Sequence, residues 1–234
     1  MMDISGTTVL VTGANGGLGR NFVEQALARG ASRVYATARR PRQWEDTRVV
    51  PLALDVTDDA SVAAAVAAAS DVDIVINNAG VGGASSLLAS SVEDVERVFA
   101  TNVFGALRVA KAFATVLASR GGGALVDVHS VLSWLAIAGG YSASKAALWS
   151  LTNSLRVELA PQGTLVVGAH LGYTDTPMIA DVDAEKNDPA EVVASIWDAV
   201  AADEDEALAD QVSRDVRAAL SGPVRSLYPQ LLAN

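Results

Sequence analysis

Short runs of β-branched residues alternate with longer alanine-rich stretches throughout this chain of 234 residues. Such alternation is typical of repeated strand–helix units, which build a parallel sheet with helices packed on both of its faces. We therefore predict an α/β fold with a doubly wound parallel sheet flanked by helices. No linker interrupts the pattern and the length suits one hydrophobic core, so we expect residues 1–234 to form a single domain.

Hydrophobic periodicity and helix-ending residues place the expected elements. Gly30 can end the first helix and Asp58 can cap the second, while Pro161 ends the helix before the last strand. The expected strands are residues 8–12, 33–37, 48–54, 72–77, 124–129 and 164–169. The expected helices are residues 18–29, 59–69, 92–119, 142–160, 189–201 and 212–220.

The composition argues against several kinds of site. The chain has no cysteine and only two histidines, His129 and His170, so we expect neither disulfides nor a bound metal. A formal net charge of −10 disfavours binding to nucleic acid, and we interpret the acidic residues 203–206 as a solvated surface. The sequence shows no signal-peptide pattern and no membrane-spanning stretch, so we expect no membrane partner and a cytoplasmic location.

A glycine-rich turn follows the first expected strand and opens the first expected helix. Its sequence is Thr12-Gly13-Ala14-Asn15-Gly16-Gly17-Leu18-Gly19. Glycine lets the backbone come close to a pyrophosphate, and the helix N-terminus presents free N–H groups and partial positive charge to it. We therefore predict dinucleotide binding here, with a purely structural turn as the alternative. The candidate residues are Gly13, Asn15, Gly17, Leu18 and Gly19.

The end of the second expected strand indicates which cofactor is preferred. It reads Thr37-Ala38-Arg39-Arg40, where an enzyme selective for NAD would place an acidic residue against the ribose 2′-hydroxyl. Arg39 instead offers a guanidinium to a 2′-phosphate, with Arg40 as a second candidate. The pattern favours NADP(H) over NAD(H), and a solvated basic loop is the alternative.

Two further motifs follow in the chain, Asn77-Asn78-Ala79-Gly80 and Tyr141-Ser142-Ala143-Ser144-Lys145. Together with the glycine-rich turn, and in this order, they resemble the short-chain dehydrogenase/reductase family over most of the chain. The resemblance implies a Rossmann-type sheet, a nicotinamide cofactor and a catalytic set of Asn102, Ser130, Tyr141 and Lys145. It also implies cofactor contacts at Asp55, Val56, Asn78, Ala79, Gly80, Tyr141, Lys145, Gly172, Thr174 and Thr176.

The spacing of Tyr141 and Lys145 supports this chemistry independently. They are four positions apart on an expected helix, so they lie on one face of it. A nearby ammonium and an oxidised nicotinamide would favour the phenolate of Tyr141, because an unperturbed tyrosine has a pKa of about 10. In carbonyl reduction Tyr141 would protonate the oxygen, to which Ser130 donates a second hydrogen bond. By resemblance, Asn102 would order a water that connects Lys145 to solvent.

Two positions depart from the family's pattern. Leu171 stands where the family has proline, a change that could loosen the segment that packs against the nicotinamide. Ser130 and Tyr141 are only 11 positions apart, which shortens the loop between them. We hypothesise that this shortening opens the substrate pocket or displaces the Ser130 hydroxyl from Tyr141. Ser133 is a less favoured substitute for Ser130.

The remaining aromatic side chains near these motifs have alternative roles. We interpret His129 and His170 as structural rather than catalytic. Trp134, in the shortened loop, is a candidate wall of the substrate pocket, whereas Trp149 is expected to pack in the core or at a subunit contact. Loops 81–90, 131–140 and 178–188 are expected to shape the pocket.

These residues predict an NADPH-dependent oxidoreductase that reduces a ketone or aldehyde to an alcohol, reversibly, with Tyr141 as acid/base. The alternatives are an imine or ketoacyl reductase on the same scaffold, and a non-catalytic NADP(H)-sensing protein. The expected partner is a small-molecule carbonyl substrate. Small and apolar residues along helices 92–119 and 142–160 favour a homodimer or homotetramer.

Overall fold

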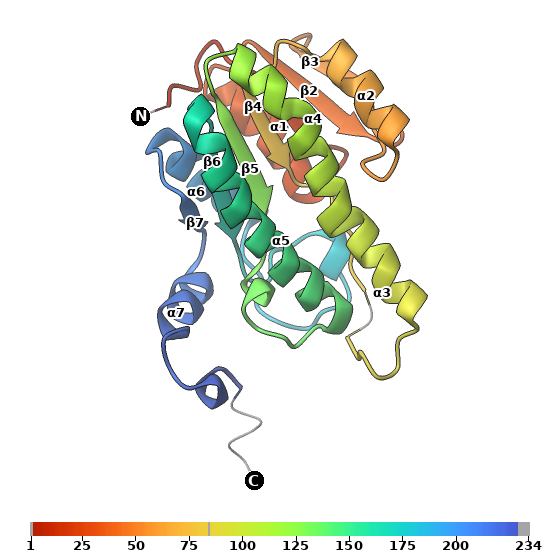
Figure 1. Ribbon diagram of the computed structural model, residues 1–234, viewed down its shortest axis with the longest axis vertical. Helices are drawn as coiled ribbons and strands as arrows, with labels where there is room; N and C mark the ends of the chain where they lie inside the picture. Colours follow the sequence, from red (N-terminus) through yellow and green to blue (C-terminus); the bar gives the residue numbers. More distant parts are fainter. Residues whose placement is uncertain (1, 84, 229–234) are drawn as a thin grey trace.

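The strands form one parallel sheet, shown in Figure 1 for the computed structural model, which describes residues 2–83 and 85–228. Residue 84, in the expected pocket loop 81–90, and residues 1 and 229–234 of the expected domain lie outside the described residues. The seven described strands follow the order β3-β2-β1-β4-β5-β6-β7. The predicted doubly wound parallel sheet is confirmed. Its strands are β1 (Thr8–Thr12), β2 (Arg33–Ala38), β3 (Val49–Ala53), β4 (Ile74–Asn77), β5 (Ala124–Val128), β6 (Leu165–His170) and β7 (Glu206–Leu208).

Helices cover both faces of the sheet, and Figure 1 shows α4 (Ala106–Ser119) and α5 (Gly139–Leu159) crossing in front of it. These two and α2 (Asp59–Ala68) bury one face, while α1 (Gly17–Ala28) packs against α6 (Pro189–Ala201) on the other. Within the described residues, no helix combines the length and apolarity needed to cross a membrane. The other helical segments are α3 (Val92–Phe99), α7 (Gln211–Ala219), the π-helical segment Ala100–Gly105 and the 3-10 segments Val131–Ser133, Ala160–Gln162, Pro177–Ile179 and Val224–Leu227.

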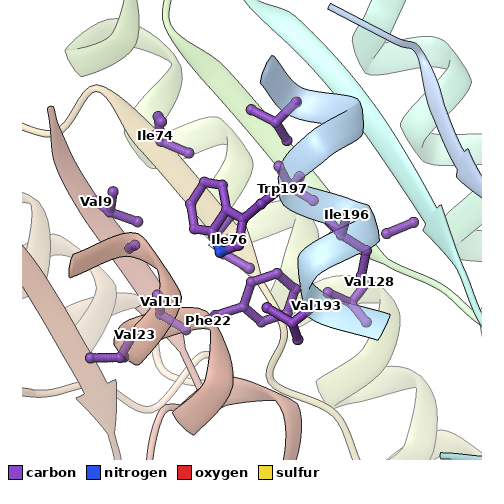
Figure 2. Close-up of a cluster of buried hydrophobic side chains, with 14 of the residues drawn as sticks. Val9, Val11, Phe22, Val23, Ile74, Ile76, Val128, Val193, Ile196 and Trp197 are labelled. Atoms are coloured by element: carbon purple, nitrogen blue, oxygen red, sulfur yellow. The ribbon is translucent and has the colours of Figure 1, made fainter. Parts of the chain in front are cut away.

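Figure 2 shows the core between the sheet and the α1–α6 pair. Val9 and Val11 of β1 point into it, whereas Leu10 between them points into the core on the opposite face, as the alternation of a strand requires. Phe22 of α1 and Trp197 of α6 meet edge to face over these strands, with ring centroids 6.1 Å apart. Both side chains are fully buried, and each stabilises the fold by about 2–3 kcal/mol. This packing holds the strand ends in a rigid frame.

The predicted continuous helix 92–119 is wrong. The chain there forms α3, then the π-helical segment Ala100–Gly105, then α4. A π-helical turn inserts an extra residue into a helix and is frequent at functional sites. Asn102 lies within it and is buried, so the irregular turn fixes the position of one of the predicted site residues.

Strand β7 was not predicted, because it begins in the acidic stretch that we interpreted as a solvated surface. Residues 203–205 are exposed, as expected. Glu206, however, begins the edge strand, and its carboxylate pairs with Arg217 of α7 at 2.9 Å. Only Ala207 of this three-residue strand is buried, so no apolar run distinguishes it from a loop.

Candidate active site

A cleft of about 1260 Å³ opens at the carboxyl ends of the first four strands. After β1 the chain crosses to β2 and β3 and then returns to place β4 on the other side of β1. In open α/β sheets, ligands bind where the strand order reverses in this way. The cleft is lined by residues that follow these strands and by residues of α3 and α5, among them Gly13, Asn15, Arg39, Arg40, Asp55, Val56, Ala79, Gly80, Val95, Val98 and Gly140.

The glycine-rich turn between β1 and α1 is packed too closely for larger residues at several of its positions. Gly13 and Gly17 have φ angles of 68° and 55°, in the left-handed region that favours glycine. A Cβ atom on Gly19 would lie 2.2 Å from the carbonyl oxygen of Gly13. The Leu18 side chain packs against the core instead of the cleft. The turn and the start of α1 therefore present backbone to the cleft, a surface that fits a phosphate.

Thr12 and Asn78 tie this turn to the end of β4. The Thr12 hydroxyl accepts hydrogen bonds from the backbone N–H groups of Asn78 and Ala79, both at 2.9 Å. The Asn78 side-chain amide donates to the carbonyl oxygens of Thr12 and Gly13, at 2.8 and 3.2 Å. Asn78 thus braces the turn, while Ala79 and Gly80 line the cleft. Thr12 begins the glycine-rich motif but was not among the predicted site residues, because nothing in the sequence distinguishes it from other strand threonines.

Two arginines stand at the cleft where β2 ends. Arg39 and Arg40 line the cleft, and both are exposed. The Asn15 side chain holds their loop, since it donates to the carbonyl oxygen of Arg40 at 2.7 Å and accepts from the backbone N–H of Arg42 at 3.1 Å. Asn15 therefore keeps the guanidinium groups beside the glycine-rich turn.

Asp55 and Val56 follow β3 and line the same cleft. The Asp55 carboxylate accepts hydrogen bonds from the hydroxyl and the backbone N–H of Thr57, at 2.7 and 2.9 Å. These bonds, with a smaller effect of the charge on Arg39, hold the pKa of Asp55 below its usual value. Val56 packs against the π-helical segment, where a Cβ on Gly105 would come within 2.7 Å of it.

Tyr141 and Lys145 lie on the first turns of α5. The Lys145 ammonium is 5.8 Å from the centre of the Tyr141 ring and donates to the carbonyl oxygen of Val128 at 2.6 Å. Burial raises the pKa of Tyr141 to about 12, although a hydrogen bond with Ser130 lowers it. Burial lowers the pKa of Lys145 to about 8, against the opposing effect of Asp127. Burial in the protein therefore favours the neutral phenol of Tyr141. We had expected the Lys145 ammonium to favour the phenolate.

Ser130 remains beside Tyr141 despite the short loop between them. Ser130 lies close enough to Tyr141 to lower the pKa of its hydroxyl, so the two side chains meet and the expected displacement of Ser130 is not observed. The Ser130 oxygen also accepts from the backbone N–H of Leu132 at 3.1 Å and lies 3.4 Å from the carbonyl oxygen of Leu171. Because the chain turns directly into the 3-10 segment Val131–Ser133, Ser130 stays at the end of β5.

The Asn102 side chain forms hydrogen bonds with two neighbouring segments. Its oxygen accepts from the backbone N–H of Val81 at 2.8 Å, and its nitrogen donates to the carbonyl oxygen of Val81 at 3.0 Å. The same nitrogen donates to the Ser144 hydroxyl at 3.1 Å. The side chain thus joins the loop after β4 to α5. Its expected part in a water chain to Lys145 stays a prediction.

The segment that follows β6 is anchored, although Leu171 replaces proline. The carbonyl oxygen of Leu171 accepts from the backbone N–H of Val131 at 2.8 Å. The N–H of Gly172 donates to the Asp210 carboxylate, which also accepts from the Asn187 side chain at 2.8 Å. The expected loosening by Leu171 stays a prediction. Asp210 was missed because only its role as a helix cap could be read from the sequence.

The end of this segment returns to the glycine-rich turn. The side chain of Thr176 lies 3.5 Å from where a Cβ on Gly17 would stand. Thr174 is buried and its hydroxyl donates to the carbonyl oxygen of Gly172 at 3.2 Å. The structure thus brings residues 172–176 and the glycine-rich turn together, as the motifs predicted.

Trp134 does not line the cleft, so its predicted role as a pocket wall is wrong. Its ring stacks on His170, with centroids 4.0 Å apart, and His170 stacks on His129 at 4.8 Å. Trp149 meets Trp134 edge to face at 6.1 Å. Burial lowers the pKa of His170 to about 4 and that of His129 well below its usual value, so both rings are neutral at pH 7. The interpretation of both histidines as structural agrees with this burial.

The shortened loop is supported by the C-terminal part of the described chain. Leu132 and Trp134 pack against Leu208 of β7 and against Val216 and Leu220 in and after α7. The hydroxyl of Tyr228 accepts from the backbone N–H of Ala136 at 3.1 Å. The loop that follows Ser130 is therefore fixed by contacts made far along the sequence.

Comparisons with known proteins agree with this geometry. A family model described as short chain dehydrogenase matches residues 7–187. An uncharacterized oxidoreductase from Myxococcus xanthus is 37% identical over 195 residues, which cover 77% of each chain. The crystal structure of a short chain dehydrogenase from Burkholderia cenocepacia in complex with NADP has a TM-score of 0.92 at 34% identity, covering 99% of this chain and 100% of that chain. A short chain dehydrogenase/reductase from Burkholderia phymatum in complex with NAD has a TM-score of 0.82 at 25% identity, covering 100% of this chain and 98% of that chain.

Proposed function

This chain belongs to the short-chain dehydrogenase/reductase family, and from that premise we propose that it is an NADPH-dependent oxidoreductase that reduces a ketone or aldehyde to an alcohol, reversibly. The observation that carries the proposal is the meeting of the Ser130 and Tyr141 side chains beside the Lys145 ammonium, which lies 5.8 Å from the centre of the Tyr141 ring. Two hydroxyl groups and a buried cation at one place suit the protonation of an oxygen that develops negative charge.

The residues of the cleft fit NADP(H). The glycine-rich turn would hold the pyrophosphate, since Gly13 and Gly17 have the left-handed φ angles of a tight turn that leads into the N-terminus of α1. Arg39 and Arg40 would pair with the 2′-phosphate. The NADP bound to the Burkholderia cenocepacia protein supports this preference, although the Burkholderia phymatum protein binds NAD. Asp55, Val56, Ala79 and Gly80 would line the adenosine, and Gly172, Thr174 and Thr176 the nicotinamide.

The reduced cofactor, when bound, supplies the hydride that the carbonyl carbon accepts. Tyr141 gives its hydroxyl proton to the carbonyl oxygen, and its raised pKa keeps that proton in place at neutral pH. Ser130 donates a hydrogen bond to the same oxygen, and the charge on Lys145 stabilises the phenolate that remains. Asn102 contributes by holding Val81 and Ser144 in place around these groups.

Loss of the reduced-nicotinamide absorbance, followed with NADPH and a panel of ketones, aldehydes and imines, tests the proposal. We expect turnover of a ketone or aldehyde, and a loss of roughly 10²–10⁴-fold in Tyr141→Phe. Tyr35→Phe is the matched control, because the Tyr35 hydroxyl binds Asp71. Turnover that survives in Tyr141→Phe would contradict the role of Tyr141. NADPH binding without turnover of any carbonyl would contradict the assignment as a carbonyl reductase.

We also propose that the chain assembles as a homodimer or homotetramer. Phe104 of the π-helical segment and Val157 of α5 are 51% and 75% exposed, so these two helical segments carry apolar side chains that a second copy would cover. Light scattering coupled to gel filtration measures the assembly directly, and a monomer at micromolar concentration would contradict it.

A further inference from the structure

The peptide group between Leu171 and Gly172 is held from both sides. Its carbonyl oxygen accepts from the backbone N–H of Val131 at 2.8 Å and from the Ser130 hydroxyl at 3.4 Å. Its N–H donates to the Asp210 carboxylate at 2.5 Å. In a trans peptide the N–H and the carbonyl point in opposite directions. One rigid plane therefore connects Asp210 to Ser130.

The same carboxylate closes the loop that follows this peptide. The Asp210 oxygen that binds the peptide also accepts from the Asn187 side chain, at 2.8 Å. Asn187 in turn pairs with the start of the loop. Its backbone N–H donates to the carbonyl oxygen of Tyr173 at 2.8 Å, and its carbonyl oxygen accepts from the N–H of Asp175 at 3.0 Å. Both ends of loop 173–187 are therefore held together at Asp210.

Between these ends the loop reaches two other parts of the site. The Thr176 side chain lies 3.5 Å from where a Cβ on Gly17 of the glycine-rich turn would stand. The Met178 side chain lies 3.7 Å from the corresponding position at Gly82, which lines the cleft. A shift at the ends of the loop would therefore change its contacts with the glycine-rich turn and with the segment after β4.

The contacts of Asp210 leave little freedom to the peptide that it binds. Asp210 is 8% exposed, and its other oxygen caps α7 by accepting from the backbone N–H of Ser213 at 2.7 Å. Hydrogen bonds from N–H donors to a carboxylate are roughly twice as strong as those between neutral groups. If the peptide flipped, the Leu171 carbonyl would face this carboxylate, and the two negative groups would repel each other. Asp210 therefore favours the orientation in which the carbonyl faces Ser130.

We propose that Asp210 is a positioning residue that orients the Leu171–Gly172 peptide and so places Ser130 and loop 173–187 for the reaction. The Ser130 hydroxyl donates to this peptide in the structure and would turn to the substrate oxygen in the reaction. The Leu171 carbonyl keeps its hydrogen bond from Val131 when Ser130 turns, so no acceptor is left unpaired. The catalytic consequence rests on the proposed function.

Limited digestion with trypsin tests the clamp without cofactor or substrate. Lys186 is the only lysine or arginine between Arg156 and Arg214, and Asn187 follows it directly. In Asp210→Ser the hydroxyl can still cap α7, but the side chain ends one bond earlier and no longer bridges the two ends of the loop. We expect cleavage after Lys186 to be the first cut and to be about tenfold faster than in the wild type, because the loop opens more often.

Asp58→Ser is the matched control, because it makes the same change at the cap of α2. The Asp58 carboxylate accepts from the backbone N–H of Ala60, in its own helix, at 2.9 Å. Cleavage after Lys186 should keep its wild-type rate in this variant. A wild-type rate in Asp210→Ser, or an equal acceleration in Asp58→Ser, overturns the proposal.

A second variant covers the case in which Asp210→Ser fails to fold and is cut at many sites at once. Asn187→Ala removes one hydrogen bond to the carboxylate and leaves the cap of α7 intact. Its rate is compared with that of a free peptide of residues 181–191 carrying the same change, so that the altered cleavage site cancels. A smaller acceleration after Lys186 supports the proposal, and no acceleration overturns it.

Turnover gives the second readout. We expect Asp210→Ser to raise the KM for NADPH about tenfold, because the loop is in place in a smaller fraction of molecules, and to lower kcat. A residue that only supports the fold would reduce the amount of active enzyme, and hence the apparent kcat, but would leave KM unchanged. An unchanged KM therefore overturns the placement of the loop for the reaction. If the wild type turns over no carbonyl, the proposed function fails, while cleavage after Lys186 still decides whether Asp210 holds the loop.

Discussion

The Asn102 side chain and the backbone of Val81 bind each other twice, with the amide oxygen accepting from the N–H and the amide nitrogen donating to the carbonyl. This bridge holds the loop after β4 against the π-helical segment. Asn102→Ala leaves both peptide groups of Val81 without these partners, so we expect a loss of about 1–3 kcal/mol in unfolding free energy and a lower kcat. Asn153→Ala is the control, because the hydrogen bonds of Asn153 within the described residues stay in α5, with Trp149 and Arg156. Equal losses in the two variants would contradict the special role of the bridge.

Gly19 and Gly16 form a matched pair within the glycine-rich turn. Gly19→Ala places a Cβ atom 2.2 Å from the Gly13 carbonyl oxygen, so the turn must shift and we expect NADPH binding to be lost. Gly16 has an extended φ of −171° and nothing within 4 Å of the corresponding position, so Gly16→Ala should bind NADPH nearly as the wild type does. Calorimetric titration measures both affinities, and similar values would show that the close packing at Gly19 is not needed for NADPH binding.

Arg39 should control the choice between cofactors. Arg39→Asp replaces a charge-assisted contact to the 2′-phosphate with repulsion, so we expect the ratio of kcat/KM for NADPH to that for NADH to fall by roughly 10²-fold. Arg42→Ser is the control, since the Arg42 guanidinium lies over the Trp44 ring, 4.5 Å from its centroid. An unchanged ratio in Arg39→Asp would assign the 2′-phosphate to Arg40 or to neither arginine.

His170 should make the protein sensitive to acid. Its pKa is about 4 in the folded protein against an ordinary value of 6.5, so the unfolded chain binds the additional proton between these values. Stability is therefore complete above pH 6.5 and falls as the pH is lowered toward 4, by up to about 3 kcal/mol. His170→Phe keeps an aromatic ring between His129 and Trp134 but cannot titrate. Urea midpoints at pH 7 and pH 4.5 should differ less in this variant, and an equal difference would exclude His170 as the cause.

The fold and the location of the site could be predicted from local signals. Strand 8–12 and the glycine-rich turn after it are specified by neighbouring residues, and the structure has β1 at the same bounds. The ends of parallel strands meet at one edge of the sheet, so motifs placed at strand ends had to converge. Tyr141 and Lys145 needed only their helical spacing to be placed together.

What could not be predicted depends on contacts between distant parts of the chain. Asn102 was expected in the site from the family resemblance, but its partner Val81 belongs to a separate loop. Trp134 looked available to a substrate because residues that cover it, such as Val216, follow much later in the sequence. From the sequence, Asp210 can be recognised only as a helix cap. Its hydrogen bond with the backbone N–H of Gly172 forms only when β6 and α7 have folded together.

The loop that follows Ser130 packs against β7 and α7, and this packing sets the order in which parts of the site can fold during synthesis. Domains begin to fold while the chain is still emerging from the ribosome, the N-terminal part first. The glycine-rich turn and its strands β1 to β4 are complete early, whereas Leu132 and Trp134 gain their packing only after Leu208 to Leu220 have emerged. A nascent chain can thus form its glycine-rich turn long before the loop beside Tyr141 is fixed. The active site is complete only after α7 has been synthesised.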